Sequence, residues 1–509
     1  WWSIIFDSRC IDRAGHHFLR HSSQSSSRQF SVRLQVKVEK YSRSFPAGVE
    51  TWQAQMTVMT SLMILILMTF AAAILESASL QTSKNIRRAD VERSVESVFA
   101  EYQKELLEEY DIFGLDGSYE TGSYTEDRVL DRMTVFGAIA GENQIEAIRF
   151  LSDNEGQEFA DQVCRYLENL YGIDMIQDLI GREDEAKQQE EKAIDFQKRE
   201  EENEKKMDEV LASGGSLEES GEGSEGEIEN PLEVLQKLKH RVLAEIVLPR
   251  DRVISQKSVE GMAGVSGRTR QEGKGNLPSV EANASEKLYM IAYIPDHFKS
   301  YTKAEDDRPL EYEQEYLIGG KQNDMENLQI VLNKIRRFRM APNFLYLQTD
   351  ETKKAEAKVL AGIVSALLGN PGLTEVVAQG VLMAWAYGES IMDLRVLTAG
   401  GKVPSVKTKE TWKLSLSGLL KLGTTQDSGS SSAGESGLSY EDYLKMLSLL
   451  ETKETLRMRM LDLIEWNLKM RLNCPFFQAD ACITRMRIQS ICQLRRGITY
   501  QFSTYYAYQ

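Results

Sequence analysis

Residues 56–75, MTVMTSLMILILMTFAAAIL, form a run of twenty residues without a charged side chain. An α-helix rises about 1.5 Å per residue, so this run spans about 30 Å, the hydrocarbon thickness of a bilayer. The sequence therefore predicts one transmembrane helix. Two other apolar stretches, 359–369 and 376–388, are too short or too close to charges to span a membrane, and we expect them to be buried helices. The predicted anchor residues are Met56, Leu62, Ile66, Phe70 and Leu75.

Glu76 follows the run directly. A carboxylate at the bilayer centre costs about 2.5 to 3.5 kcal/mol, whereas at the end of a span it can lie among lipid headgroups. We therefore expect Glu76 to be an interface carboxylate, and the alternative is a pairing contact with a neighbouring membrane helix. Ala71–Ala73 resemble a signal-peptidase site, so a cleaved signal peptide is the rival of a retained anchor. The length of the run and the helix-compatible sequence after it favour retention.

Charge is distributed unequally on the two sides of this run. The 509-residue chain has a net charge of −16, which argues against a nucleic-acid partner. Residues 1–55 carry +4, which leaves −20 for the rest. Basic residues before a span and acidic residues after it predict a single-pass protein of the cell membrane, with a cytoplasmic N-terminus and an extracellular C-terminal part.

The fold class expected is mainly α with a small β part (α+β). Apolar residues recur at three- and four-residue steps from Ser77 to Phe113, so the membrane helix is expected to continue as a long stalk helix that ends at Gly114. A short amphipathic block should follow, up to about Ile180. The tail changes to alternation in 483–494 and 498–508, which predicts a C-terminal β-hairpin.

Five parts are expected along the chain. Residues 1–55 are a basic N-terminal segment, disordered or not native to the protein, and 56–75 are the transmembrane helix. Residues 76–181 form the stalk helix and a small membrane-proximal part. Residues 182–230 contain a charged, solvated helix with acid–base pairs at four-residue spacing, followed by an acidic flexible linker. Residues 231–509 form a mainly helical ectodomain that ends in the β-hairpin.

Several elements of this ectodomain can be placed. We expect an amphipathic helix at 231–248 and a strand or helix at 310–320, after which Asp324 would cap a new helix. Helices 349–368 and 374–397 should form a helical hairpin across a Gly/Asn/Pro turn. A further helix is expected at 440–472.

Residue patterns for catalysis are absent from the sequence. None of the motifs GxSxG, HExxH, GxxxxGK[ST] or DFG occurs, so we predict no enzyme, no cofactor and no small-molecule substrate. Glu311, Glu313 and Glu315 alternate and could hold a hard cation on one strand face, but a solvated edge face is the preferred interpretation. Trp385, Tyr387, Trp412 and Trp466 are expected in the core.

Five cysteines are present, without the spacing of a zinc site. A disulfide among Cys474, Cys482 and Cys492 is one alternative outside a cell. Buried free thiols are the other.

Several blocks together carry a family resemblance: TVMTSLMILILMTFAAAILESASL (57–80), ESVFAEYQKELLEEYDIFGLDGSY (96–119), LEYEQEYLIGGKQNDMENL (310–328) and MAWAYGESIMDLRVLTAGGKVPSVKT (383–408). The first resembles the single-anchor start of bacterial membrane proteins linked to tight-adherence (Tad/Flp-type) pilus loci, which include TadE/TadG-like pseudopilins. More closely, the chain resembles a family of unknown function in Gram-positive anaerobes that shares this anchor. The likeness covers residues 56–509 apart from the acidic linker.

This resemblance implies a non-enzymatic structural or accessory component of a pilus or secretion apparatus. Its partners would be the lipid bilayer and other pilus or secretion membrane proteins, which it would contact through the anchor and the stalk helix. The sequence departs from processed prepilins, because no Glu stands at the required place ahead of Met56. A membrane-tethered surface receptor or scaffold, and a surface-anchored enzyme with an unrecognised site, are the alternatives.

Overall fold

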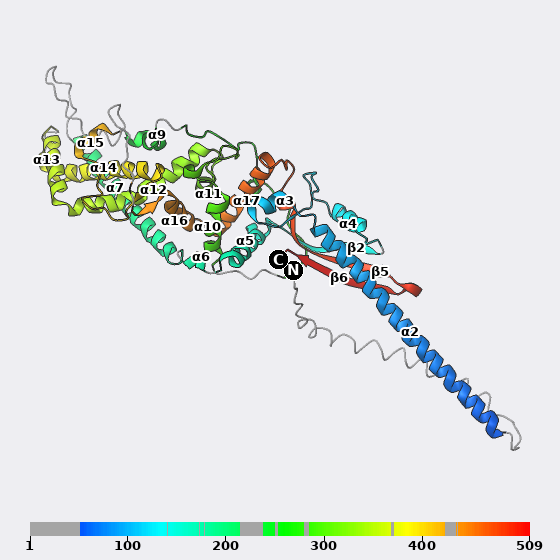
Figure 1. Cartoon of the computed structure of the whole chain (residues 1–509). Helices are drawn as coiled ribbons and strands as arrows, with labels where there is room; N and C mark the ends of the chain where they lie inside the picture. Colours follow the sequence, from blue (N-terminus) through cyan, green and yellow to red (C-terminus); the bar gives the residue numbers. More distant parts are fainter. Residues whose placement is uncertain are drawn as a thin grey trace. The chain divides into compact units, whose positions relative to one another are not determined.

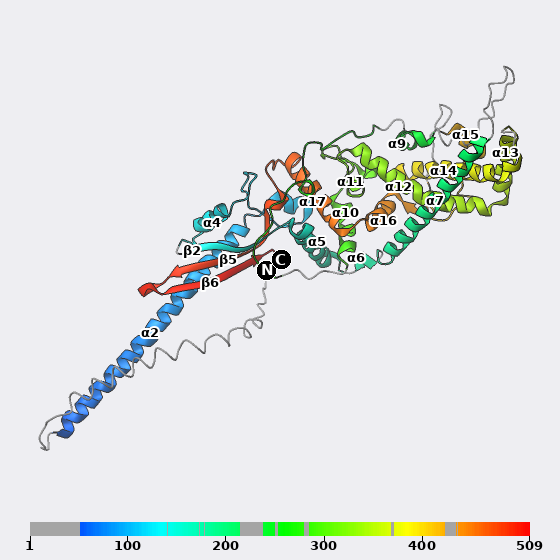
Figure 2. The same ribbon diagram turned by 180° about the vertical axis from the view of Figure 1, so that it is seen from behind.

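The computed structural model describes residues 51–508, except 140, 173, 178, 214–237, 250–252, 279–284, 368–370, 423–433 and 435. The chain divides into two compact units, residues 1–82 and 83–509. The described residues are mainly helical with a small antiparallel sheet, as predicted (Figures 1 and 2). The basic segment up to residue 50 and the acidic linker from residue 214 lie outside the described residues.

Helix α2, Thr51–Phe99, contains the whole predicted membrane run. No Gly or Pro interrupts its sequence, so nothing in the backbone opposes a continuous helix. All described residues of the first unit belong to α2. Every side chain from residue 56 to residue 79 is exposed.

The helix ends at Phe99 rather than near Gly114, so the prediction of an unbroken stalk helix is wrong. A turn occupies 100–103, and the short helix α3 (Lys104–Tyr110) follows. The apolar residues on the two sides of this turn belong to different cores, since Phe99 packs with the sheet and Leu106 with the helical core. The break allows the chain to contribute to both.

Four strands form the main sheet: β1 (Leu115–Asp116), β2 (Glu142–Phe150), β5 (Cys482–Gln493) and β6 (Thr499–Ala507). Central β5 pairs antiparallel with β2 along one edge and with β6 and β1 along the other. Strands β5 and β6 are the predicted C-terminal hairpin, which is confirmed. The sheet also joins parts of the chain that the sequence analysis places in separate regions, 76–181 and 231–509.

Strand β2 lies where the sequence suggested an amphipathic block. Its register shifts between Ile145, which faces Ile488, and Ala147, which faces Arg487. Glu146 is therefore the extra residue of a β-bulge, and buried Ala147 and Ile148 are consecutive. The bulge breaks the two-residue alternation by which a strand is recognised.

The last turns of α2 and helix α4 (Glu126–Val135) pack against this sheet. Val95 and Val98 of α2 and Met133 of α4 are buried in one cluster with Ile488 of β5. Arg88 of α2 lies 5.7 Å from the centre of a ring on β6. This part of the predicted stalk is therefore a core helix of the second unit.

The other helices form a second hydrophobic core, in which α12 and α14 are central. A two-stranded ribbon, β3–β4, lies beside α14. The bounds are α5 Asp153–Tyr171, α6 Asp174–Gln177, α7 Arg182–Ser213, α9 Leu243–Val247, α10 Glu286–His297, α11 Glu313–Gly319, α12 Asp324–Thr349, α13 Glu351–Leu367, α14 Thr374–Thr398, β3 Lys402–Val403, α15 Leu416–Lys421, β4 Leu438–Ser439, α16 Tyr440–Leu450 and α17 Lys453–Met470, with single 3₁₀ turns at Val265–Gly267, Tyr301–Lys303, Pro371–Leu373, Ala479–Ala481 and Arg495–Gly497.

The predicted helical hairpin is confirmed as α13 and α14, which lie side by side in both views (Figures 1 and 2). The single helix expected at 440–472 is wrong, because the chain contains two helices there, α16 and α17. The Thr452 hydroxyl accepts the backbone N–H of Thr455 and starts a new helix. Glu451 just before it is extended.

Helix α7 confirms the charged helix, and Lys187–Glu183 and Arg199–Asp195 form two of its predicted ion pairs, at 2.9 and 2.8 Å. It is not solvated all round. Ala193 and Phe196 are buried, and the helix packs on α12, α14 and α16. The few apolar residues of α7 form the side that packs on the core.

Two helix starts differ from the predictions. The cap of α12 is Asn323, whose side chain accepts the N–H groups of Met325 and Glu326, so Asp324 is the first helical residue. In the segment 231–248, the part that the structure describes is interrupted at Arg241, and α9 begins after it.

The packing of the segment between α3 and β1 against β5 can be tested at Gly114. A Cβ added there would lie 2.2 Å from Sγ of Cys482, so Gly114→Ala forces the neighbour to move. We expect a loss of about 1–3 kcal/mol in the free energy of unfolding, measured by denaturant titration of the full chain in detergent. Adding Cys482→Ala should restore much of it. Gly362→Ala is the control, since nothing lies within 4 Å of its added Cβ. Equal effects at both glycines would contradict the packing argument.

Candidate functional site

The predicted anchor residues all lie on α2 and are exposed. Met56, Leu62, Ile66, Phe70 and Leu75 are each more than half exposed. In the part of the chain that the structure describes, α2 is the one helix long and apolar enough to cross a membrane, and none of that stretch is buried. Glu76 is exposed as well and directly follows the apolar run.

The hydroxyl groups in this run bond to the helix itself. Thr60 donates to the carbonyl of Met56 at 2.9 Å, and Thr69 donates to that of Ile66 at 2.8 Å. Ser61 likewise donates to the Val58 carbonyl at 2.9 Å. A helix whose backbone and hydroxyl groups are satisfied internally can be surrounded by lipid without leaving polar groups unpaired.

The three C-terminal cysteines are free thiols in the structure. Cys482 and Cys492 are buried, and burial raises the pKa of both thiols. Cys474 is half-buried, and burial raises its pKa to about 11. These thiols are protonated at neutral pH and are poor nucleophiles.

Of the alternating carboxylates, Glu313 and Glu315 lie on helix α11 and Glu311 lies just before it, so the expected solvated edge face is wrong. Glu313 and Glu315 are completely buried. Glu313 accepts a hydrogen bond from Arg308 at 2.8 Å, whereas Glu315 accepts from the Tyr440 hydroxyl at 2.7 Å and the Tyr301 N–H at 2.9 Å. Burial raises the pKa of each carboxyl to about 7. Within the described residues, no group of three or more His, Cys, Asp and Glu is arranged to hold a metal ion.

A second buried network joins α12, α14 and the loop before α15. Lys407 lies 2.6 Å from Glu389 and 2.6 Å from Asp393, and Asp393 also accepts from Arg339 at 3.0 Å. All four side chains are buried, so the ions are separated from solvent. Their geometry fixes the loop on the helices. Sequence reasoning missed this network because carboxylates and lysines are abundant throughout the chain.

The aromatic residues Trp385, Tyr387 and Trp466 are buried in the core, as predicted, and Trp412 is partly buried against it. Trp385 donates its indole N–H to the carbonyl of Leu414 at 2.9 Å. Trp385 thereby joins α14 to the loop before α15, whereas Trp466 of α17 packs edge-on against Tyr316 of α11.

His297 has partners that its spacing in the sequence did not reveal. Its Nε2 lies 3.1 Å from an oxygen of Asp111 and its Nδ1 lies 3.1 Å from the Tyr293 carbonyl. The ring also stacks on that of Tyr293, with 3.8 Å between centroids. Both ring nitrogens are engaged, which describes a histidine held in the core.

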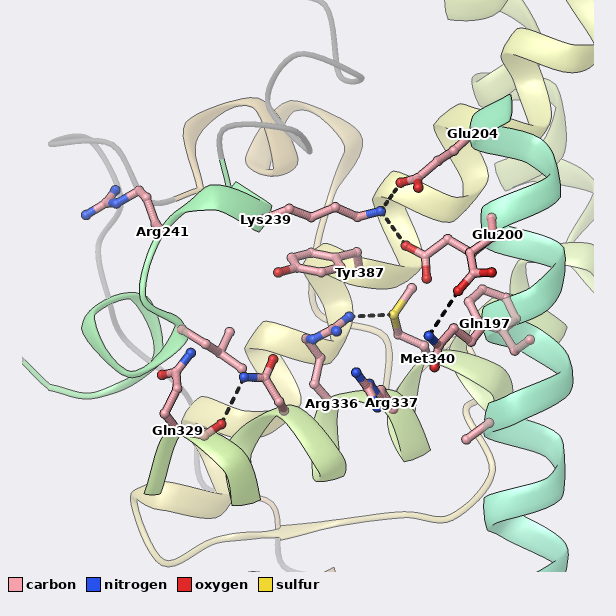
Figure 3. Close-up of a pocket in the computed structure, with 15 residues that line it drawn as sticks. Gln197, Glu200, Glu204, Lys239, Arg241, Gln329, Arg336, Arg337, Met340 and Tyr387 are labelled. Atoms are coloured by element: carbon pink, nitrogen blue, oxygen red, sulfur yellow. Dashed lines mark hydrogen bonds and ion pairs between the residues drawn. The ribbon is translucent and has the colours of Figure 1, made fainter. Parts of the chain in front are cut away.

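A pocket of about 300 Å³ lies between α7, the segment before α9, α12 and α14 (Figure 3). On one side, Lys239 contacts Glu200 at 2.6 Å and also Glu204. On the other side, the guanidinium of Arg336 lies over the ring of Tyr387, 4.6 Å from its centroid. The lining residues come from four separate segments, so the pocket cannot be predicted from a local sequence motif.

One family model matches residues 221–494, and its description is a family of unknown function (DUF5702). This match spans more than half of the chain. The chain belongs to the DUF5702 family. The DUF5702 region contains both buried ionic networks and the α9, α12 and α14 sides of the pocket, whereas α2 and α7 precede it. No curated protein and no solved structure matches the chain.

The buried carboxyl of Glu315 predicts a pH dependence. Its pKa is raised from 4.5 to about 7, so the folded state retains a proton that the unfolded state releases at lower pH. Stability is therefore lost as pH rises through this window. Glu315→Gln removes this titrating group. The free energy of unfolding of the variant, relative to that of wild type, should therefore rise by on the order of 2 kcal/mol as the pH increases from about 5 to about 8. Exposed Glu326→Gln is the control, and parallel pH curves for Glu315→Gln and wild type would contradict the assignment.

The lysine network predicts a large effect of a single change. Lys407→Met leaves Glu389 and Asp393 buried beside no ammonium group, and breaking such a pair costs about 3–5 kcal/mol. We expect this loss in chemical denaturation of the full chain. Exposed Lys409→Met should cost little. Adding Glu389→Gln to the Lys407 variant should recover part of the loss, and strictly additive effects would show that the two groups are not coupled.

Proposed function

We propose that the chain is a membrane-anchored, non-enzymatic structural or accessory component of a Tad/Flp-type pilus or secretion apparatus. The observation that carries the proposal is the apolar surface of α2, exposed on all its faces from residue 56 to residue 75. Burying one large apolar side chain is worth about 1.5–3 kcal/mol. An uncharged helical surface of this extent calls for lipid, or other membrane helices, as its surroundings.

Two features support an anchor over a core helix of a water-soluble protein. A core helix is mostly covered by its own chain, whereas none of this stretch of α2 is buried. The hydroxyls of Thr60 and Thr69 are also bonded within the helix. A secretory signal peptide would share both features, so the mature N-terminus is part of the test.

Orientation and partners follow from charge and resemblance. The basic segment before α2 and the acidic remainder favour a cytoplasmic N-terminus and an extracellular second unit. The pilus assignment rests on the likeness of the anchor to TadE/TadG-like proteins. The exposed residues 56–75 of α2 are the surface available to partner helices in the membrane. The anchor and Glu76 would then contact neighbouring single-pass proteins.

A membrane-tethered receptor or scaffold is the second candidate. One observation favours it: helix α13 exposes an apolar side, on which Val359 is 67% and Ile363 is 41% exposed. This side, with Leu360 and Leu416, lines a shallow hollow. Exposed apolar side chains in a group are typical of surfaces that bind other proteins.

The anchor is tested by alkaline carbonate extraction of membranes from cells that produce the full chain. Wild type should stay in the membrane pellet. Ile66→Asp places a carboxylate at the centre of the span, at a cost of about 2.5–3.5 kcal/mol, and should move a large fraction to the supernatant. The control is Ile86→Asp, the same change on the same helix beyond the apolar run, where the side chain is 52% exposed. Equal extraction of wild type and both variants would argue against a membrane span.

N-terminal sequencing and protease shaving of intact cells complete the experiment. Cleavage of the second unit from the outside, with α2 retained, supports the proposed orientation. A mature chain that begins after Ala73 and is free in the medium would identify a signal peptide and overturn the anchor. Crosslinking from α2 to other pilus membrane proteins would support the pilus assignment, and exclusive crosslinks from α13 would favour the scaffold.

A further inference from the structure

Arg336 is a cation of the pocket in Figure 3 without a carboxylate partner among the described residues. Its Nη1 donates to the sulfur of Met340 at 2.9 Å, which is a weak acceptor, and its Nε is buried without any hydrogen-bond partner. Burial lowers the pKa of this guanidinium. The side chain as a whole is half-buried, and a donor nitrogen that is buried without a partner is costly and calls for an explanation.

Two fully buried arginines of this unit are paired with carboxylates. Arg339, three residues further along α12, lies 3.0 Å from Asp393, and Arg308 lies 2.8 Å from Glu313. Arg339 shows that the neighbouring helix α14 supplies a carboxylate to a guanidinium of α12 when the pairing is structural. The absence of one at Arg336 is therefore a property of the pocket rather than of α12.

The acidic residues in the pocket are engaged elsewhere. Glu200 and Glu204 contact Lys239, and Glu201 accepts a hydrogen bond from Gln197 at 3.1 Å. The dashed lines in Figure 3 show these contacts on the α7 side, across the pocket from Arg336. The α12 side keeps a net positive charge, which a second guanidinium, that of exposed Arg337, increases.

We propose that this pocket binds a small ligand that carries one carboxylate or phosphate group, with Arg336 as the residue that receives the anionic group. The oxyanion supplies the acceptors that the guanidinium lacks, and Tyr387 holds the guanidinium plane in place. Arg337 attracts the anion at the mouth. The volume of about 300 Å³ suits a small molecule.

The acidic side chains of α7 restrict the charge of the ligand. Glu200, Glu201 and Glu204 line the same pocket, so a polyanion would be repelled by them. The part of the ligand that faces α7 must then be neutral or cationic. A compound with a single oxyanion at one end, such as an amino acid or a phosphate monoester, fits this charge pattern.

The experiment measures binding by the full chain in detergent micelles, so it does not depend on whether α2 is an anchor in cells. Thermal unfolding is followed while sodium acetate or inorganic phosphate is titrated against sodium chloride of equal ionic strength. Wild type should show a saturable rise in Tm with at least one of the two probes. A response to acetate alone would identify a carboxylate ligand, and a response to phosphate alone a phosphate ligand.

Variants assign the effect to Arg336. Arg336→Gln should weaken binding at least tenfold, and the control Arg495→Gln, an exposed arginine on the turn between β5 and β6, should leave it unchanged. Arg336→Met should be at least as stable as wild type in chloride, because it removes a half-buried charge whose Nε has no partner, and should lose that advantage when the probe saturates wild type. If Arg336→Gln does not fold, Arg336→Lys keeps the charge and should still bind at least fivefold more weakly. A Tm that follows ionic strength alone, or an equal response in wild type and Arg336→Gln, would overturn the proposal.

Discussion

The constraint on which this molecule depends is that residues 56–75 of α2 present apolar side chains on every face and cannot be covered by the chain's own described residues. The same helix then changes character without a break. Beyond Ser83 it belongs to the second unit, where Val91, Val95 and Val98 are buried with the sheet. The N-terminal part of α2 therefore exposes apolar side chains, whereas its C-terminal part packs in the core of the second unit.

The second unit contains buried ions that form two networks. Lys407, Glu389, Asp393 and Arg339 form one network, and Glu313 with Arg308 forms another. Such groups add little net stability relative to apolar residues of the same shape, because desolvation offsets attraction. These ion pairs are directional, so they specify how the elements pack: each bond is satisfied by one arrangement of α11, α12, α14 and the loop before α15. Arg336 stands apart from these networks.

Sequence reasoning could predict the elements with strong periodicity. The charge-free run, the hairpin of α13 and α14, the charged helix α7 and the C-terminal strands each carry a clear local pattern. It failed where a tertiary contact overrides that pattern. The turn after Phe99 follows a sequence that remains helix-compatible, and Glu146 adds a bulge that hides β2. Glu313 and Glu315 read as solvated because their partners, Arg308 and Tyr440, are brought in by other segments.

The pairing of β2 with β5 has a consequence for how the protein is made. The Ser490 hydroxyl on β5 donates to Asn143 on β2, a residue 347 positions earlier. During synthesis β2 emerges long before its partner, so its edge stays open while the intervening helices are produced. Contacts this distant in sequence form late and slow the search for the native state. If the chain is exported, the sheet beside α2 is the last region to close, only after the C-terminus has crossed, and until then a chaperone or a neighbouring strand has access to that edge.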